Sequence, residues 1–164
     1  MLLDWQRTFI FLPSRTDNSQ LHLPLVTDRM SANIDMSFSA RYVKPEELRL
    51  VWDQVRPALL EVKEASQEPW IPEDVYADCY AGKSMLFVLG DSRVTGFGVV
   101  QPQGDTLHVW CGWGAWLMDE GMKELFAIAK QGGARKITFD SNRPGWQRIA
   151  KKYGFRPRKW IAEV

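Results

Sequence analysis

The alternation of short strand-like runs with longer helical runs between residues 37 and 164 constrains the fold of this chain most strongly. We expect a strand over 37–43, a helix opening at Pro45 and a second helix from Pro72 to Gly82. In the first helix, apolar residues recur every three or four positions and form one face: Leu48, Val51, Trp52, Val55, Leu59 and Val62. Pro57 predicts a kink in this helix or its division into two.

The second half of the chain predicts a hairpin followed by alternating helices and strands. The hairpin joins 85–89 to 94–101 through Gly90-Asp91-Ser92-Arg93. The elements expected after it are a strand over 106–111, a helix over 119–131, a strand over 136–139, a short helix over 144–152 and a last strand over 155–164. This order is typical of an α+β (mixed α/β) domain whose central mixed, mostly antiparallel sheet is flanked by helices.

Residues 1–36 differ from the regular pattern that follows. Short apolar pieces end at Pro13 or contain Pro24, and a polar, turn-rich stretch over 14–18 lies between them. We therefore divide the chain into an irregular N-terminal extension, 1–36, and a domain, 37–164. The extension is expected either to pack on the domain or to bind a protein partner.

Composition and charge exclude several classes of protein. The net charge of +1 combines −7 over residues 1–122 with +8 over residues 123–164. No apolar stretch approaches the roughly 20 residues of a membrane-spanning helix, and the polar first residues do not resemble a secretion signal. The only cysteines, Cys79 and Cys111, are expected to be buried free thiols of a reducing, cytoplasmic compartment. Neither they nor the two histidines have metal-ligand spacing, so we expect no metal site.

The stretch from Lys136 to Phe155 resembles the GCN5-related N-acetyltransferase (GNAT) superfamily. That superfamily often has a strand, an Asn, and a short amphipathic helix that ends in Gly-Phe before a last strand. Asn142 and Gly154-Phe155 occupy those places, and the resemblance extends over residues 37–164. It implies the acyl-CoA N-acyltransferase fold, with acetyl-CoA as co-substrate and an unknown amine as acceptor. A purely structural alternative for Asn142 is a helix cap.

The resemblance also implies a cofactor site where the 106–111 strand passes into the next helix. Backbone N–H groups there would hold the pyrophosphate of acetyl-CoA. The chain offers Cys111, Gly112, Trp113 and Gly114 in place of the usual Arg/Gln-x-x-Gly-x-Gly/Ala signature. We predict these four residues and Asn142 as cofactor-binding, with glycine allowing close backbone approach. Asp119 and Glu120 would repel a phosphate, and the alternative interpretation of Gly-Trp-Gly is a tight turn.

No catalytic residue is assigned from the sequence. The tyrosine that many family enzymes place four residues before the Gly of Gly-Phe is Ala150 here, and Tyr153 lies three residues later. A general base would be a carboxylate or a histidine. Groups that we considered for this role are His108 on a predicted central strand and three acids on the second helix: Glu73, Asp74 and Asp78. Each has an ordinary structural explanation as well.

Tryptophans and basic residues gather around this region. Trp110, Trp113 and Trp116 recur every three residues and either line a pocket or serve core and interface packing. The C-terminal basic residues suit the phosphates of CoA, an acidic partner or simply a solvated face, and no nucleic-acid-binding motif accompanies them.

Two functions follow from these patterns. One is an acetyl-CoA-dependent N-acetyltransferase. The other is a catalytically inactive protein of the same fold that binds a protein partner through the N-terminal extension and the Trp-rich surface. With the fold pattern retained and the usual cofactor signature missing, the chain resembles acetyltransferase-like proteins of bacteriophages. This resemblance implies a location in the host cytoplasm or the virion.

Overall fold

A five-stranded sheet with helices on both faces forms the part of the chain that the computed structural model describes, residues 40–66, 68–141 and 145–157. The strands follow chain order: β1 (Arg41–Val43), β2 (Met85–Leu89), β3 (Gly96–Gln103), β4 (Thr106–Gly114) and β5 (Lys136–Phe139). The first four pair antiparallel and β5 pairs parallel to β4. The sheet is therefore mixed and mostly antiparallel, as the sequence predicts.

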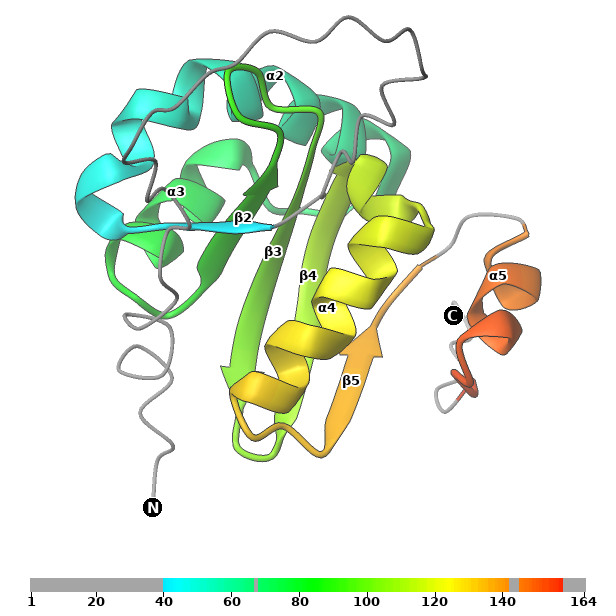
Figure 1. Cartoon of the computed structure of the whole chain (residues 1–164). Coiled ribbons are helices and arrows are strands. Elements are labelled where there is room, and N and C mark those ends of the chain that lie inside the picture. The colour runs from blue at the N-terminus through cyan, green and yellow to red at the C-terminus, as the bar shows by residue number, and fades with distance from the viewer. Residues whose placement is uncertain (1–39, 67, 142–144, 158–164) are drawn as a thin grey trace, which may run out of the picture.

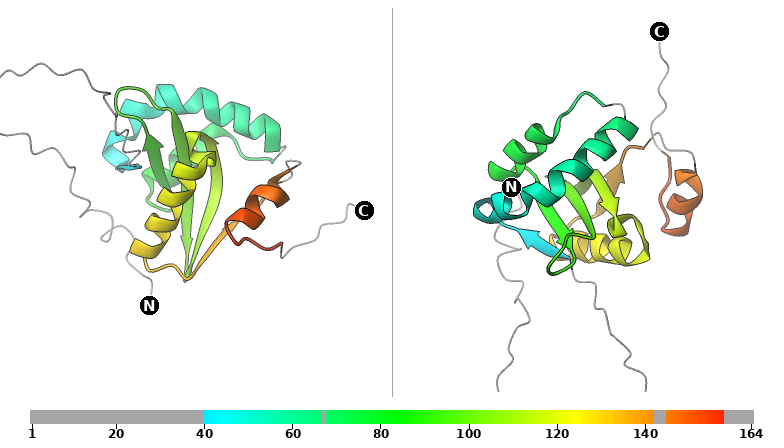
Figure 2. Two further views of the ribbon diagram at one scale, coloured as in Figure 1. Left: turned by 45° about the vertical axis from the view of Figure 1, so that its right-hand side comes forward. Right: turned by 90° about the horizontal axis from the view of Figure 1, so that it is seen from above.

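The helices divide between the two faces of the sheet (Figure 1; Figure 2). α2 (Leu48–Ser66) and α3 (Pro72–Tyr80) cover one face, and α4 (Asp119–Gln131) covers the other. α5 (Trp146–Lys152) lies beyond β5, at the parallel edge of the sheet. Two short 3-10 helices, η1 (Pro45–Glu47) and η2 (Ala115–Leu117), precede α2 and α4.

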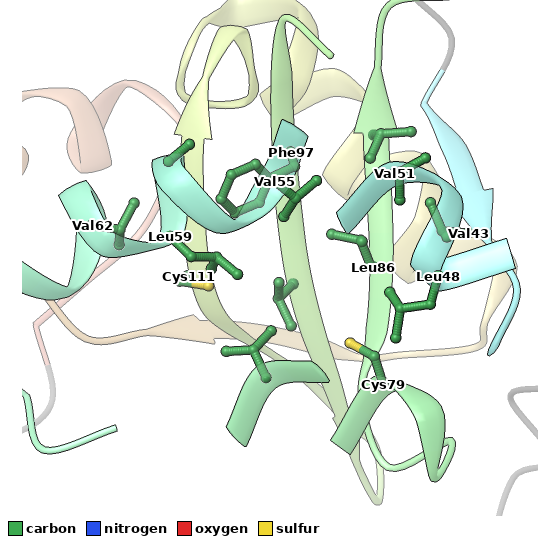
Figure 3. Packing of buried hydrophobic residues seen from close by; sticks show 14 of the residues in the cluster. Val43, Leu48, Val51, Val55, Leu59, Val62, Cys79, Leu86, Phe97 and Cys111 are labelled. Atoms are coloured by element: carbon green, nitrogen blue, oxygen red, sulfur yellow. The ribbon is translucent and has the colours of Figure 1, made fainter. Parts of the chain in front are cut away.

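Each face of the sheet carries its own apolar core. Between the sheet and the α2 and α3 helices, the buried residues include Val55, Leu59 and Val62 of α2 and Phe97 and Cys111 of the sheet (Figure 3). Between the sheet and α4, they include Phe87 and Leu107 of the sheet, Trp116 of η2, and Met122 and Leu125 of α4. Burial of apolar area on both faces is the main force that holds these layers together.

α2 continues without interruption through Pro57, so the predicted division into two helices is wrong. Proline removes one backbone donor and costs about 3 kcal/mol in a helix interior. Pro57 lies on the exposed side, whereas Val55 before it and Leu59 after it are fully buried. Packing of this apolar face on the sheet outweighs the local cost.

The predicted last strand over 155–164 is also wrong for its described part, since 155–157 contains no strand. Pro157 restricts the backbone there and cannot donate to a ladder. Phe155 instead packs its ring against Phe126 and Phe139, with centroid distances of 6.0 and 4.9 Å. Residues 158–164 and the predicted extension, 1–36, lie outside the described residues, as do 37–39 of the first predicted strand.

No helix in the described part of the chain is long and apolar enough to cross a membrane.

Candidate functional site

β4 and β5 diverge halfway along β4. Their parallel pairing runs from Thr106↔Lys136 to Val109↔Phe139 and stops there, because β5 ends at Phe139. β4 continues to Gly114, paired on its other side with β3. Beyond Val109, the β5-facing edge of β4 thus has no strand partner among the described residues.

A β-bulge marks the same point on β4. The register with β3 passes from Val100↔Val109 to Val99↔Cys111, which leaves Trp110 as the extra residue. A bulge changes the phase of side-chain alternation along its strand. Val109 accordingly packs with the α4-side core, whereas Trp110 and Cys111 belong to the α2/α3-side core.

A cavity of about 460 Å³ lies at this divergence and receives side chains from both faces of the sheet. From α2 and the connection to α3 come Val62, Ser66, Glu68 and Trp70. From β4, η2 and α4 come Val109, Trp110, Cys111, Gly112, Trp116, Leu117, Met122 and Leu125. Phe139, Asp140, Ser141 and Trp146 complete it from β5 and α5. A concave, mainly apolar site with a few polar groups is typical of small-molecule binding.

Trp116 explains the glycines of this region. Its side chain is 1% exposed and lies against Gly98 and Gly112, which are neighbours across β3 and β4. A Cβ on Gly112 would lie 2.7 Å from Trp116 Cδ1, and one on Gly98 would overlap the indole. Gly112 therefore makes room for a buried ring as well as leaving its backbone accessible.

The predicted cofactor residues are only partly brought together. Cys111 and Gly112 line the cavity, whereas Trp113 and Gly114 do not. Trp113 donates Nε1–H to Glu61 Oε2 at 2.9 Å and stacks on Phe97. The alternative interpretation as a tight turn is wrong for Gly112 and Trp113, which pair with β3 inside β4, whereas Gly114, with a φ of 61°, ends the strand where η2 begins. Asn142 lies outside the described residues.

Both cysteines are buried free thiols, as predicted. Burial raises the pKa of Cys79 to about 12 and raises the pKa of Cys111 further above its usual range. The thiolate is the nucleophilic form of cysteine. Cys111 is therefore a neutral apolar component of the cavity wall.

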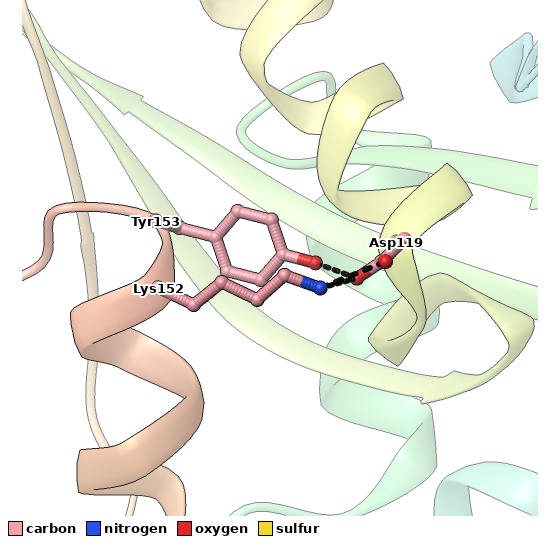
Figure 4. Close-up of polar contacts among 3 residues, drawn as sticks. All are labelled: Asp119, Lys152 and Tyr153. Carbon is pink, nitrogen blue, oxygen red and sulfur yellow. Dashed lines mark hydrogen bonds and ion pairs between the residues drawn. The ribbon is translucent and has the colours of Figure 1, made fainter.

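The N-terminus of α4 is occupied by a contact with α5 (Figure 4). Lys152 Nζ lies 2.7 and 2.8 Å from the two Asp119 carboxylate oxygens, and the Tyr153 hydroxyl donates to the same carboxylate. These hydrogen bonds lower the pKa of Asp119 and raise the pKa values of Lys152 and Tyr153. The first turn of α4 is thus acidic, with an ion-paired lysine above it.

The groups considered as general bases lie away from the cavity. His108 Nδ1 is 3.1 Å from Thr138 Oγ1, on the paired part of β4. Glu73 pairs with Arg56 at 2.8 Å, Asp74 accepts the Ile71 N–H at the start of α3, and Asp78 pairs with Lys83. None of these four residues lines the cavity, and Ala150 does not line it either.

The polar and aromatic cavity residues that sequence reasoning missed include Glu68, Trp70, Asp140 and Ser141. The first two lie in the α2–α3 connection and the last two directly follow β5. The position of Asp140 and Ser141 at the end of a strand was the available signal, since binding groups often follow strands of open sheets. Among the described residues, no group of three or more His, Cys, Asp or Glu side chains is placed to bind a metal ion.

Comparisons with known proteins identify the fold. No sequence family and no curated protein matches the chain. Among solved structures, it is similar to a probable acetyltransferase, with a TM-score of 0.57 and 15% identity over 76% of this chain and 94% of that one. An aminoglycoside N-acetyltransferase in complex with CoA matches with a TM-score of 0.53 and 11% identity, over 77% and 97% of the two chains.

A ribosomal-protein-alanine N-acetyltransferase from Brucella melitensis biovar Abortus 2308 gives a TM-score of 0.53 and 10% identity, over 77% and 96% of the two chains. At such identities the likeness defines the architecture. The chain has the GNAT acetyltransferase fold, as the sequence resemblance implies.

Proposed function

We propose that this protein is an acetyl-CoA-dependent N-acetyltransferase acting on an amine. The observation that carries the proposal is the cavity at the divergence of β4 and β5, which side chains line from both faces of the sheet. An acetyl donor and an amine acceptor can then meet from opposite faces. Acetyl-CoA would supply an activated thioester, whose carbonyl carbon the amine attacks as CoA leaves as the thiol.

The unpartnered edge of β4 suits the acyl-carrying arm of CoA. This arm contains two amide groups, and an extended amide chain can pair with an exposed strand edge. Residues 110–114 provide such an edge beyond the last pair with β5, and Trp110, Cys111 and Gly112 of this segment line the cavity. Trp110, Cys111 and Gly112 would hold the arm along the cavity.

The phosphate end of CoA fits less well. The expected place is the N-terminus of α4, where backbone amides and the helix dipole favour anions. Asp119 and Glu120 occupy this turn, and the basic group beside them, Lys152, is already paired with Asp119. An incoming phosphate would compete with the Asp119 carboxylate for Lys152, so we expect modest affinity for CoA.

A calorimetric titration with acetyl-CoA, and with CoA alone, tests this proposal. We expect a dissociation constant below about 100 μM, or roughly −5.5 kcal/mol. Ser141→Trp should weaken binding by filling the cavity, because Ser141 lies exposed on its wall. Ser92→Trp, in the exposed turn between β2 and β3, is the matched control. The absence of heat at millimolar ligand, or equal binding by both variants, contradicts the proposal.

A second function is favoured by the acidic first turn of α4. On this alternative, the Asp119–Lys152–Tyr153 contact fixes α5 over an inactive cofactor site, and the protein is a protein-binding or phage virion-associated module. Deletion of 1–36 should then leave a folded domain but abolish co-purification of a partner. The described residues from 40 onward supply an apolar core on each face of the sheet, which supports folding of the shortened chain.

An assay for thiol release from acetyl-CoA, with a panel of amines, separates the two functions. Amine-dependent release of CoA supports the enzyme. Binding of acetyl-CoA without release by any amine, together with loss of a partner on deletion, supports the module.

A further inference from the structure

The wall of the cavity that faces α2 and α3 is aromatic. Trp70, 8% exposed, lies edge-on to Trp110 with ring centroids 6.0 Å apart and an interplanar angle of 71°. The two rings come from the α2–α3 connection and the β4 bulge. The bulge therefore places an indole where the cavity meets the α2/α3 layer.

A carboxylate is held beside these rings. Glu68 Oε2 accepts the Trp70 Nε1–H at 2.9 Å, which fixes the acid relative to the indole. Glu68 is itself exposed whereas Trp70 is buried, so the carboxylate stays accessible to a charged ligand beside an apolar wall. Asp140 supplies a second carboxylate, directly after β5.

The described lining of the cavity has two carboxylates and five aromatic side chains, the latter being Trp70, Trp110, Trp116, Phe139 and Trp146. It includes no Lys, Arg or His among the residues that the structure describes. Tryptophan faces attract cations through the ring quadrupole, most strongly where water is partly excluded. Carboxylate and indole side by side favour a positively charged, partly apolar ligand over a neutral or anionic one.

We infer that the acceptor is a small amine carrying one positive charge on an aromatic or apolar group, bound at Glu68 and the Trp70–Trp110 wall. Calling it the acceptor rests on the proposed function; the binding of the amine itself does not. The cavity volume of about 460 Å³ and its mainly apolar lining suit a small amine with an apolar or aromatic group. A polycationic aminosugar would leave most of its charges and hydroxyl groups without partners, at a cost in desolvation.

The probes are 2-phenylethylamine, the neutral 2-phenylethanol and the anionic 3-phenylpropionate, with kanamycin as the polycation. Each is titrated into the full chain by calorimetry, without CoA and with saturating CoA, so that ordered binding is detected. We expect 2-phenylethylamine to bind at least about tenfold more tightly than the other three. Glu68→Gln should weaken its binding roughly three- to tenfold.

Glu64→Gln is the matched control, because Glu64 is an exposed acid on α2 that does not line the cavity. Its affinity for 2-phenylethylamine should equal that of the unaltered protein. Equal affinity for amine and alcohol, equal effects of the two Gln variants, or no amine binding in either condition overturns the inference.

The outcomes also separate this inference from the proposed function. Acetyl-CoA binding without selective amine binding overturns the amine site alone. Selective, Glu68-dependent amine binding without any acetyl-CoA binding contradicts the acetyltransferase and leaves an amine-binding site.

Discussion

At the scale of single residues, one buried indole determines much of the local sequence. Trp116 packs between the sheet and α4, and a Cβ on Gly98 or Gly112 would meet its ring, whereas one on Gly121 would meet its backbone. These glycines are thus required by packing. The same arrangement explains why a Gly-Trp-Gly run forms strand here instead of a turn.

Gly98→Ala should lower the free energy of unfolding by about 1–3 kcal/mol, because the new methyl group would overlap the Trp116 ring in a filled core. Urea unfolding measures this. In a Trp116→Leu background, which opens space at the same point, the Gly98→Ala substitution should cost much less. A Gly98→Ala effect that is the same in both backgrounds contradicts the packing account.

Asp119 gives a prediction about pH. Hydrogen bonds from Lys152 and Tyr153 lower its pKa from an ordinary value of 3.8. A carboxylate with a lowered folded-state pKa stabilises the protein above its unfolded-state pKa, and this contribution is lost as the pH falls through the lowered value.

Asp119→Asn should therefore reduce the melting temperature at pH 6, and its difference from the unaltered protein should shrink as the pH falls below about 4. Thermal melts monitored by circular dichroism test this, with Glu120→Gln, an exposed neighbouring acid, as control. A difference that is constant from pH 6 to pH 3 contradicts a role for the ionised Asp119.

At the scale of elements, α2 forms in spite of the proline in its interior. Pro57→Ala should raise the free energy of unfolding by about 1–2 kcal/mol, because it restores a helical backbone donor on the exposed side and increases helix propensity. Part of that gain is offset by the greater freedom of Ala in the unfolded chain. Chemical denaturation measures the change, and a loss of stability would mean that Pro57 makes a favourable contact.

The elements that the sequence predicts well are those with periodic apolar residues. α3, α4 and β5 begin and end close to the expected positions, since proline, glycine and periodicity are local signals. β4 runs three residues past its predicted end because Gly112 and Gly114 pair with β3, and Gly112 also makes room for the Trp116 ring. These contacts form only in the folded sheet. A local sequence pattern does not indicate contacts of this kind.

The same reason limits prediction of the site. Cys111 and Gly112 were predicted because the family resemblance points to the end of β4, and both line the cavity. Glu68 and Trp70 were missed because they lie in the connection between α2 and α3. This connection comes close to β4 only when the whole α2–α3 layer packs on the sheet. The three acids on α3 that were considered as bases lie away from the cavity, where they serve the helix cap and ion pairs.

At the scale of the whole molecule, both portions of the divided charge contribute to the region around the cavity. The acidic portion, 1–122, contributes Glu68 to the proposed amine side. The basic portion, 123–164, includes Lys152 beside the proposed phosphate end. Asp119 and Glu120 of the acidic portion lie at the same phosphate end, and Asp140 of the basic portion lines the cavity, so the charge favours the amine more clearly than the phosphates.

Hydrogen–deuterium exchange of the backbone amides, with and without acetyl-CoA, tests most directly the claim that this divergence binds the acyl carrier. We predict that acetyl-CoA slows exchange in the 110–114 segment of β4 and leaves the exposed β2–β3 turn unchanged. Unchanged exchange across β4 at saturating acetyl-CoA, or protection confined to another part of the molecule, would contradict the account.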